Sequence, residues 1–352
     1  MSEVLMLVGR YAADGCAGLS LYAFDQHNAS FGFLDSIDLA APSYLVADQA
    51  SDMLYVVDEL KDSSASLSAV HVDSARHQLK IVNAVRTEGA SPCHVAKYGD
   101  MVATANYRGG SVSLFRISQS GCILSLQTVI KGIIGGPDPT RQGTPHVHSV
   151  LFSPDGRYLF ATDFSADRIM GVQVTKPLLH DATIIGHDIA RTIPVTPDAI
   201  GGYGPRHMVF SSDKRYLYVI GELSDCVTVY EYHEGSLSEV QTIVADDDHG
   251  RGGGDILFSP DGKFLYTSHR RKNDKIVIFS VDRHSGLLTK IGTHPTKSHP
   301  RQFSLTPNGR FLLVACMDEH VIQIFRRNPA TGLLSDTNQS VSIETPAFVG
   351  FL

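Results

Sequence analysis

One pattern recurs along the chain and constrains the fold more than any other feature. An apolar run leads into a turn, and two further apolar runs follow. The copy at residues 146–174, HVHSVLFSPDGRYLFATDFSADRIMGVQV, shows it most clearly. Proline presets φ and glycine tolerates a positive φ, so SPDG predicts a tight turn between two strands. A repeat of this kind indicates the fold class before composition does.

Six copies are visible, and each contains three predicted strands. They cover residues 42–60, 92–117, 146–174, 205–232, 253–282 and 300–327. A seventh copy is split between the two ends of the chain. Residues 346–352 (PAFVGFL) match the first strand of the pattern, and residues 4–11 (VLMLVGRY) and 18–25 (GLSLYAFD) match the second and third. Between copies lies one further predicted strand, for example at residues 31–39 and 287–294.

Four strands per unit of roughly 50 residues, repeated about seven times, predict an all-β fold, a seven-bladed β-propeller with four-stranded antiparallel blades. The C-terminal strand would pair with the N-terminal strands in one blade, which closes the ring and leaves no free sheet edge there. We expect residues 1–352 to form a single propeller domain.

Charge and composition exclude several classes of function. The formal net charge is −7, so the chain offers no basic face for nucleic acid. Its N-terminal apolar run, VLMLV, is too short for a signal peptide and follows Glu3, and no later run could span a membrane. The five cysteines are scattered and never spaced as CxxC, which predicts reduced buried thiols rather than disulfides or a structural zinc site. We therefore expect a cytoplasmic protein.

Two positions of the repeat break its consistency. In a propeller blade, the residues just before the first strand and just after the second lie at the same end of the central channel, here called the channel mouth. Five residues before the turn, the copies carry Ser43, Cys93, His148, Arg206, Gly254 and Arg301, with Ala347 in the split copy. Eleven residues after the turn they carry Glu59, Phe164, Glu222, Arg270 and Met317, with Tyr107 and roughly Tyr11 in the two irregular copies. A purely structural position would keep one apolar type, so this end of the channel is the predicted site.

Each of these residues also has a structural interpretation. His148 could be a core histidine bonded to a backbone carbonyl. Arg206 and Glu222 could form an ion pair within one blade. Arg270 and Arg271 could be a solvated hairpin end, and Arg301 could tie two blades together. The shared register of these side chains at one mouth favours the functional interpretation.

Metal and nucleotide sites are not expected. His146 and His148 form an HxH that on a strand would point both rings to one side, but no third ligand follows at a fixed spacing. Residues 246–249 (DDDH) are predicted to be a solvated connection. The glycine- and proline-rich loop at residues 132–145, here called the mouth loop, leads into His148 and should lie over the mouth. Its glycines do not join a strand to a helix, as a nucleotide phosphate loop would require. We expect no metal and no cofactor.

Four segments together carry a resemblance to a known family. HVHSVLFSPDGRYLFATD, GPRHMVFSSDKRYLYVIGEL, FSPDGKFLYTSHR and HPRQFSLTPNGRFLLVA resemble the bacterial propeller-type 6-phosphogluconolactonases, a family that includes the fungal 3-carboxy-cis,cis-muconate lactonizing enzyme. The resemblance covers essentially the whole chain and implies a seven-bladed propeller with chemistry on a lactone. It also implies that the polar channel residues of the family correspond to His148, Arg206, Glu222, Arg270 and Arg301. Gly221 departs from the usual Asn, and the DIHI segment reads DILF at residues 255–258.

The expected function is hydrolysis of an anionic sugar lactone, most similar to that of 6-phosphogluconolactonase. His148, whose ordinary pKa is about 6.5, is the candidate general base for a water molecule. Arg206 and Arg270 are candidates to stabilise the oxyanion, and Glu222 to orient Arg206 or act as acid or base. Arg301 is the candidate to hold a carboxylate or phosphate. The remaining candidate substrate-binding residues are His146, Glu59, Tyr107 and Arg271.

Two alternatives stay open at this point. The same residues could serve a muconate-lactonizing cycloisomerase, in which the arginines hold a carboxylated diene and His148 or Glu222 delivers a proton to carbon. The chain could also be a non-enzymatic propeller scaffold. The expected partner is a small anionic lactone or carboxylate, with no nucleic acid or membrane, and the protein is expected to be a monomer or a weak homo-oligomer.

Overall fold

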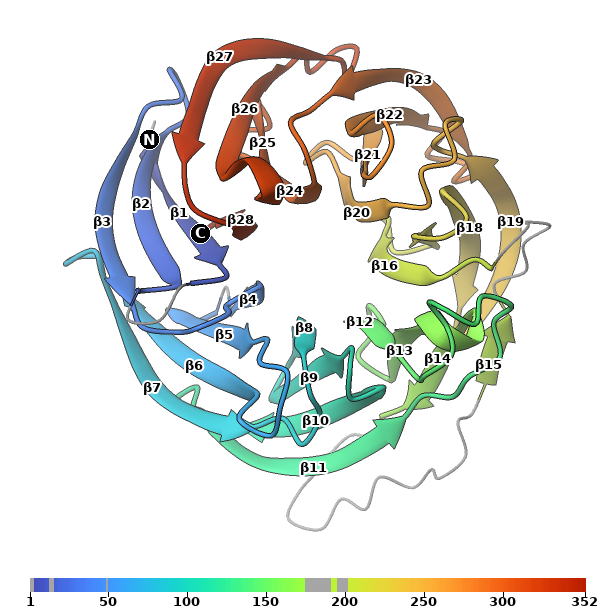
Figure 1. Ribbon diagram of the computed structural model, residues 1–352, viewed down its shortest axis with the longest axis horizontal. Helices are drawn as coiled ribbons and strands as arrows, with labels where there is room; N and C mark the ends of the chain where they lie inside the picture. Colours follow the sequence, from blue (N-terminus) through green and yellow to red (C-terminus); the bar gives the residue numbers. More distant parts are fainter. Residues whose placement is uncertain (1–2, 13–15, 49, 175–190, 195–201) are drawn as a thin grey trace.

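Seven four-stranded antiparallel sheets stand in a ring around a central channel (Figure 1). The computed structural model describes residues 3–12, 16–48, 50–174, 191–194 and 202–352. Within each sheet the innermost strand lines the channel and the fourth lies at the rim (Figure 1). The predicted seven-bladed propeller is confirmed.

The blades follow one another along the chain. Blade 1 contains β28 (Pro346–Phe351), β1 (Glu3–Arg10), β2 (Leu19–Asp25) and β3 (Phe31–Ile37). Blade 2 contains β4 (Tyr44–Asp48), β5 (Met53–Asp58), β6 (Ser66–Asp73) and β7 (Gln78–Arg86). Blade 3 contains β8 (Pro92–Tyr98), β9 (Met101–Asn106), β10 (Ser111–Ile117) and β11 (Ile123–Lys131). Blade 4 contains β12 (Val147–Phe152), β13 (Tyr158–Asp163), β14 (Arg168–Gln173) and β15 (Arg191–Pro194).

The last three blades repeat the arrangement. Blade 5 contains β16 (Pro205–Phe210), β17 (Tyr216–Gly221), β18 (Cys226–His233) and β19 (Ser236–Val244). Blade 6 contains β20 (Gly253–Phe258), β21 (Phe264–His269), β22 (Lys275–Val281) and β23 (Leu288–Pro295). Blade 7 contains β24 (Pro300–Leu305), β25 (Phe311–Cys316), β26 (Val321–Arg327) and β27 (Leu334–Ser342). The helices of the described residues are two single 3₁₀ turns, Phe164–Ala166 and Met317–Glu319.

The ring closes as the split repeat predicts. β28 pairs antiparallel with β1, so the two ends of the chain share blade 1. Closure replaces an open sheet edge with a hydrogen-bonded ladder. Within the described residues, no helix has the length and hydropathy needed to cross a membrane.

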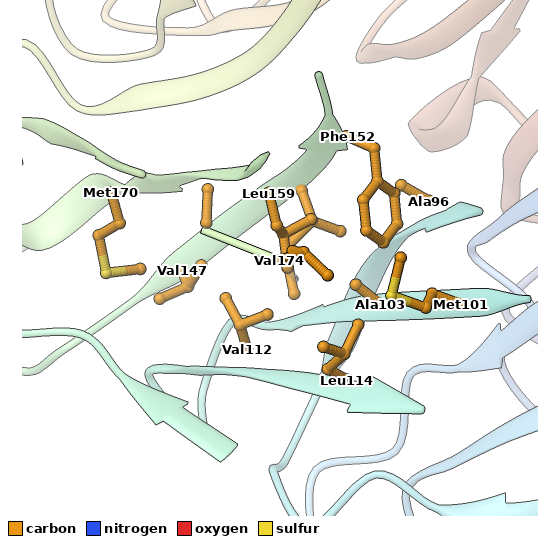
Figure 2. Packing of buried hydrophobic residues seen from close by; sticks show 13 residues of the cluster. Ala96, Met101, Ala103, Val112, Leu114, Val147, Phe152, Leu159, Met170 and Val174 are labelled. Atoms are coloured by element: carbon orange, nitrogen blue, oxygen red, sulfur yellow. The ribbon is translucent and has the colours of Figure 1, made fainter. Parts of the chain in front are cut away.

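Burial explains why the second strand of each repeat is so apolar. β5, β9, β17, β21 and β25 are buried at every position, because neighbouring blades cover both of their faces. Figure 2 shows one such interface, where Met101 and Val112 of blade 3 pack against Leu159 and Met170 of blade 4. A fully buried side chain of this size stabilises the fold by about 1.5–3 kcal/mol. The outer strands β7, β11, β19 and β27 are mostly exposed or half-buried.

The copies of the repeated turn share one hydrogen-bond pattern. Ser153 Oγ donates to Asp155 Oδ1 at 2.6 Å and accepts from the backbone N–H of Tyr158 at 2.9 Å. Gly156 has φ 68°, which a side chain would strain. The same pair of bonds recurs with Ser211 and Asp213, Ser259 and Asp261, and Thr306 and Asn308. Because the turn is fixed, the distance along the chain from the turn to the channel mouth is fixed too.

All five cysteines are free thiols. Cys93, Cys226 and Cys316 are buried, as predicted. Cys16 is exposed and Cys122 is half-buried, so the expectation of buried thiols is wrong for these two, which lie outside the packed strands.

Candidate active site

Most of the residues five positions before the turn occupy β-bulges. At the start of five innermost strands the pairing ladder skips one residue, between Pro92 and His94, Val147 and Ser149, Pro205 and His207, Pro300 and Gln302, and Pro346 and Phe348. The skipped residues are Cys93, His148, Arg206, Arg301 and Ala347. A bulge releases a residue from the strand's alternation and redirects its side chain, which is why bulges are common beside active sites.

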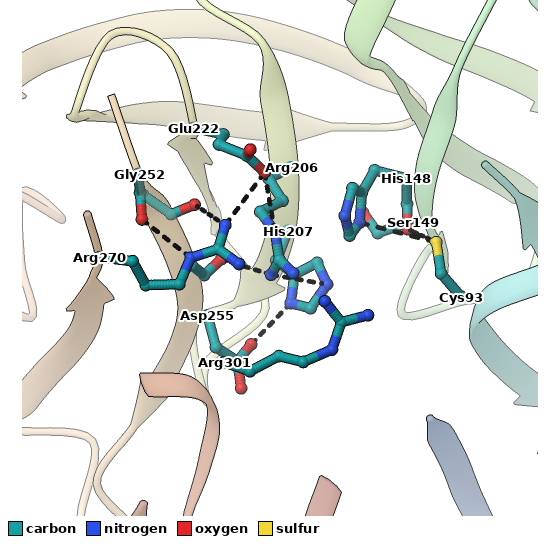
Figure 3. Close-up of polar contacts among 12 residues, drawn as sticks. Cys93, His148, Ser149, Arg206, His207, Glu222, Gly252, Asp255, Arg270 and Arg301 are labelled. Carbon is teal, nitrogen blue, oxygen red and sulfur yellow. Dashed lines mark hydrogen bonds and ion pairs between the residues drawn. The ribbon is translucent and has the colours of Figure 1, made fainter. Parts of the chain in front are cut away.

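The residues eleven positions after the turn meet the bulged residues at the same mouth. The backbone N–H of each donates to a carbonyl just before the innermost strand of its own blade. These bonds join Glu59 to Ala41 (2.8 Å), Tyr107 to Ser91 (2.8 Å), Phe164 to His146 (2.9 Å), Glu222 to Gly204 (2.8 Å), Arg270 to Gly252 (3.0 Å) and Met317 to His299 (3.0 Å). The repeat therefore holds both sets of side chains at one end of the channel, where Figure 3 shows several of them facing one another.

Glu222 is the centre of an arginine cluster. Its Oε2 lies 3.1 Å from Arg206 Nε and 3.2 Å from Arg270 Nη2. Its Oε1 lies 2.6 Å from Arg141 Nη2 and 3.3 Å from Arg271 Nη2. Burial alone would raise the pKa of the Glu222 carboxyl, but the guanidinium groups of Arg270, Arg206 and Arg141 hold it well below its ordinary value. Glu222 is therefore a carboxylate, and it is too firmly ionised to serve as an acid at neutral pH.

Arg270 is held rigidly on its other side. Its Nε donates to Gly252 O at 3.1 Å, and its Nη1 lies 3.1 Å from His299 Nε2. A guanidinium can only donate, so His299 Nε2 accepts and its Nδ1–H donates to Asp318 at 3.1 Å. Burial and the neighbouring Arg206 lower the pKa of Arg270 to about 9. Burial is the largest cause of that shift, and the positive charge of the neighbouring arginines adds to it.

Arg206 is fixed by a buried histidine–aspartate pair that the sequence analysis did not identify. Arg206 Nη1 lies 3.3 Å from His207 Nε2, and His207 Nδ1 lies 2.7 Å from Asp255 Oδ1. The arginine must donate, so His207 carries its proton on Nδ1 and donates it to Asp255. Burial raises the pKa of Asp255 to about 6, against the opposing effect of Arg206. The signal was the histidine that follows Arg206 in the PRH motif.

His148 faces this cluster as a neutral imidazole (Figure 3). The Cys93 thiol donates to the His148 carbonyl at 3.2 Å, so Cys93 Sγ, 3.8 Å from His148 Nδ1, can act toward the ring only as an acceptor. This places the ring proton on Nδ1 and leaves the Nε2 lone pair available. Burial and then the positive charge of Arg206 hold the pKa of His148 well below its ordinary value. The ordinary imidazole pKa assumed from the sequence is wrong for this environment.

Arg301 and Glu59 pair with each other across the channel mouth. Arg301 Nη2 lies 3.2 Å from Glu59 Oε2 and 2.5 Å from the Tyr11 hydroxyl, which itself donates to Glu59 at 2.7 Å. The Arg301 guanidinium also lies over the Tyr11 ring, 5.3 Å from its centroid. Burial raises the pKa of Tyr11, so its phenol stays protonated. Both residues predicted to bind substrate therefore have partners inside the protein.

An aromatic wall borders the cluster. The Tyr107 and His146 rings stack with centroids 4.2 Å apart, and Tyr107 meets His148 edge to face at 5.3 Å. His146 Nδ1 lies 2.9 Å from the Tyr107 carbonyl. The two histidines of the HxH thus approach the same tyrosine ring, although only His148 belongs to β12.

Arg141 is the cluster residue that sequence reasoning missed. It lies in the mouth loop, whose position over the mouth was predicted, and reaches Glu222 from 81 positions away in the sequence. The loop is tied down by Asp138, which pairs with Arg251 at 2.5 Å, and by Gln142, whose side chain donates to Phe164 O at 2.9 Å and to Asp167 at 2.6 Å. A non-repeating loop has no register, so no pattern could assign Arg141.

One group in the described part of the chain has the spacing of metal ligands. Ligand atoms of Asp225, Asp246 and His269 lie within 4.8 Å of one another, and all three residues are buried. Lys275 Nζ lies 2.6 Å from Asp246 Oδ1, so an ammonium group already supplies positive charge there. The expectation of a solvated DDDH segment is wrong for Asp246, whose exposure is 0%. His146 and His148 do not belong to this group.

Comparisons with known proteins agree with the geometry. The family model "Lactonase, 7-bladed beta-propeller" matches residues 5–351. A 6-phosphogluconolactonase from Formosa agariphila is 32% identical over 335 residues, which cover 93% of each chain. A crystal structure of a Bacteroides uniformis protein proposed to be a 6-phosphogluconolactonase has 42% identity and a TM-score of 0.94 over 100% of both chains. The periplasmic gluconolactonase PpgL of Pseudomonas aeruginosa has 30% identity and a TM-score of 0.90 over 100% of this chain and 99% of its own. The chain therefore belongs to the family of seven-bladed β-propeller lactonases.

Proposed function

We propose that this protein hydrolyses an anionic sugar lactone, as a 6-phosphogluconolactonase does. The observation that carries the proposal is the Glu222 cluster beside His148, in which buried guanidinium groups face a neutral imidazole. Lactone opening needs a proton acceptor for water and positive charge for the oxyanion, and this mouth provides both. Relatives named 6-phosphogluconolactonase and gluconolactonase support the same reaction.

The proposed mechanism begins with attack of water on the lactone carbonyl carbon. His148 Nε2 takes the water proton as the new C–O bond forms. The carbonyl oxygen becomes an oxyanion facing Arg206 and Arg270, whose N–H groups are already oriented by Glu222 and backbone carbonyls. Collapse of the tetrahedral intermediate breaks the ring C–O bond, and the His148 imidazolium returns its proton to the departing ring oxygen. The product is a hydroxy acid, whose carboxylic acid group then loses its proton to solvent.

The low pKa of His148 is compatible with this role. The surrounding positive charge disfavours a lasting imidazolium, so His148 is unprotonated and ready at neutral pH. When water attacks, the negative oxyanion forms in the same region and offsets the proton that His148 has accepted. Proton transfer and charge development are thereby coupled at one site.

The test is a screen of purified protein against 6-phosphogluconolactone, glucono-1,5-lactone and 3-carboxy-cis,cis-muconate. We expect loss of the phosphorylated lactone, measured by acid release. Replacing His148→Ala should lower kcat by about a hundredfold or more, with the melting temperature and circular dichroism retained. His233→Ala, at the exposed end of β18, is the matched control. Turnover of the muconate alone would indicate the cycloisomerase instead, and turnover of none of the three would indicate a scaffold.

We also propose that the enzyme works in the cytoplasm on a diffusible small substrate. Its five unpaired cysteines support a reducing compartment. Cell fractionation with detection of the native chain tests this point, since recovery in the periplasmic fraction would contradict it.

A further inference from the structure

The Glu222 cluster carries more positive charge than it needs to hold one carboxylate. Four guanidinium groups surround Glu222, and among the described residues no second carboxylate lies within ion-pair distance of any of the four. The Glu59 cluster, by contrast, has one guanidinium for one carboxylate. Concentrating uncompensated positive charge in a partly buried site is unfavourable unless an anion arrives to offset it.

The four arginines divide by depth into an inner and an outer pair. The side chains of Arg206 and Arg270 are 2% and 7% exposed, whereas those of Arg141 and Arg271 are 25% and 49% exposed. The inner pair also donates to the backbone carbonyls of Gly254, Gly252 and Gly253. Arg141 bonds Glu222 and is also held by a hydrogen bond with Tyr107, and Arg271 donates to Glu222. Since a guanidinium has five N–H donors, the outer pair retains donors that a solvent-facing ligand can use.

Arg141 is also positioned in advance of ligand binding. The mouth loop that carries it is fastened on both sides of Arg141, by Asp138 to Arg251 and by Gln142 to Asp167. The Arg141 guanidinium lies over the Phe164 ring, 5.4 Å from its centroid. A cation that is already oriented loses little conformational freedom when it binds an anion.

We propose that Arg141 and Arg271 form the subsite for the phosphate monoester of the substrate, while Arg206 and Arg270 face the lactone carbonyl. This inference rests on the proposed lactonase function and deepens it. A dianionic phosphate accepts several hydrogen bonds and matches the planar fork of a guanidinium. Solvent at the channel mouth keeps the phosphate partly hydrated. The lactone ring extends from the phosphate toward His148.

The experiment compares two substrates that differ only in the phosphate. kcat/KM is measured for 6-phosphogluconolactone and for glucono-1,5-lactone with the wild type, Arg141→Ala and Arg271→Asn. Asn is chosen at position 271 because Arg271 has φ 76°, which asparagine tolerates. We expect the ratio of the two kcat/KM values to fall at least about tenfold in each variant, the size expected when a charge-assisted hydrogen bond is lost. Inorganic phosphate should also inhibit the wild type more strongly than either variant.

The controls distinguish failure of the phosphate subsite from failure of the proposed lactonase function. Arg157→Ala removes a half-exposed arginine that pairs with Asp155 at the turn end of blade 4, and should leave the ratio within twofold. A ratio that falls less than tenfold in both outer-pair variants overturns the phosphate subsite while the lactonase function stands. If the wild type hydrolyses neither lactone, the function fails, and calorimetric binding of 6-phosphogluconate against gluconate still decides the subsite. Equal affinity of the wild type for the two acids would then overturn it.

Discussion

Two glutamates at the channel mouth, the buried Glu222 and the half-buried Glu59, have opposite surroundings. Glu222 is shared by four guanidinium groups from blades 5 and 6 and from the mouth loop. Glu59 of blade 2 pairs with Arg301 of blade 7 and accepts a hydrogen bond from Tyr11 of the closing blade. Both clusters arise from equivalent positions of the repeat, so the fold alone does not explain the difference between them.

We interpret the difference as that between a site that awaits a ligand and a site whose charges are already paired. The Glu59 cluster is balanced in charge and links three parts of the ring, which suits a structural role. The Glu222 cluster has an excess of positive charge and adjoins the neutral His148, which suits chemistry on an anion. Substitutions in or beside the Glu222 and Glu59 clusters test this difference.

Glu222→Gln should have the largest effect on catalysis. Removing the carboxylate leaves four guanidinium groups to repel one another, and Arg206 and Arg270 lose their common anchor. We expect kcat to fall about 10²–10³-fold, as when an oxyanion-stabilising donor is lost. Steady-state kinetics on the phosphorylated lactone measure it. A kcat within threefold of the wild type would show that the cluster does not serve catalysis.

Glu59→Gln should act mainly on stability. The largely buried Arg301 is left without its counter-ion, which costs up to about 3 kcal/mol in the free energy of unfolding. The folded fraction should keep kcat within tenfold of the wild type, because the Glu222 cluster is untouched. Urea unfolding and kinetics on the same preparation separate the two effects. The comparison fails if this variant loses more activity than Glu222→Gln at equal folded fraction.

Asp255→Asn should change the pH dependence more than the maximal rate. Burial raises the pKa of Asp255 to about 6, so its carboxylate is ionised above pH 6 and becomes neutral below. Protonation weakens its hold on His207 and hence on Arg206, so wild-type kcat should decline as the pH falls through about 6. The variant should show about a tenfold lower kcat and no inflection there. A pH–rate profile checks this, and an unaltered inflection would assign it to another group.

Cys93→Ala should have the smallest effect. The Cys93 thiol touches His148 through Sγ at 3.8 Å, and burial raises its pKa, so it is a neutral neighbour rather than a nucleophile. We expect kcat within threefold of the wild type and a loss of about 1 kcal/mol in stability. Complete loss of turnover in a folded variant would make Cys93 a participant in the reaction.

The repeat predicted the fold and the places where site residues stand, because turn and strand lengths set both. It predicted that His148, Arg206, Glu222 and Arg270 belong to one mouth. It could not predict Arg141, since the mouth loop lies outside the repeat and its partner is set by tertiary structure. The Asp255–His207 bond joins two blades, and a contact between blades is not encoded in the repeated sequence pattern. The low pKa of His148 also depends on neighbours that only the closed ring brings together.

The most direct test of the account is a crystal structure of the protein with 6-phosphogluconate, the product of the proposed reaction. The account predicts the product at the channel mouth, with its carboxylate between Arg206 and Arg270 near His148 and its phosphate on Arg141 and Arg271. A product bound at the turn end of the channel, or on the outer strands of the blades, would contradict it.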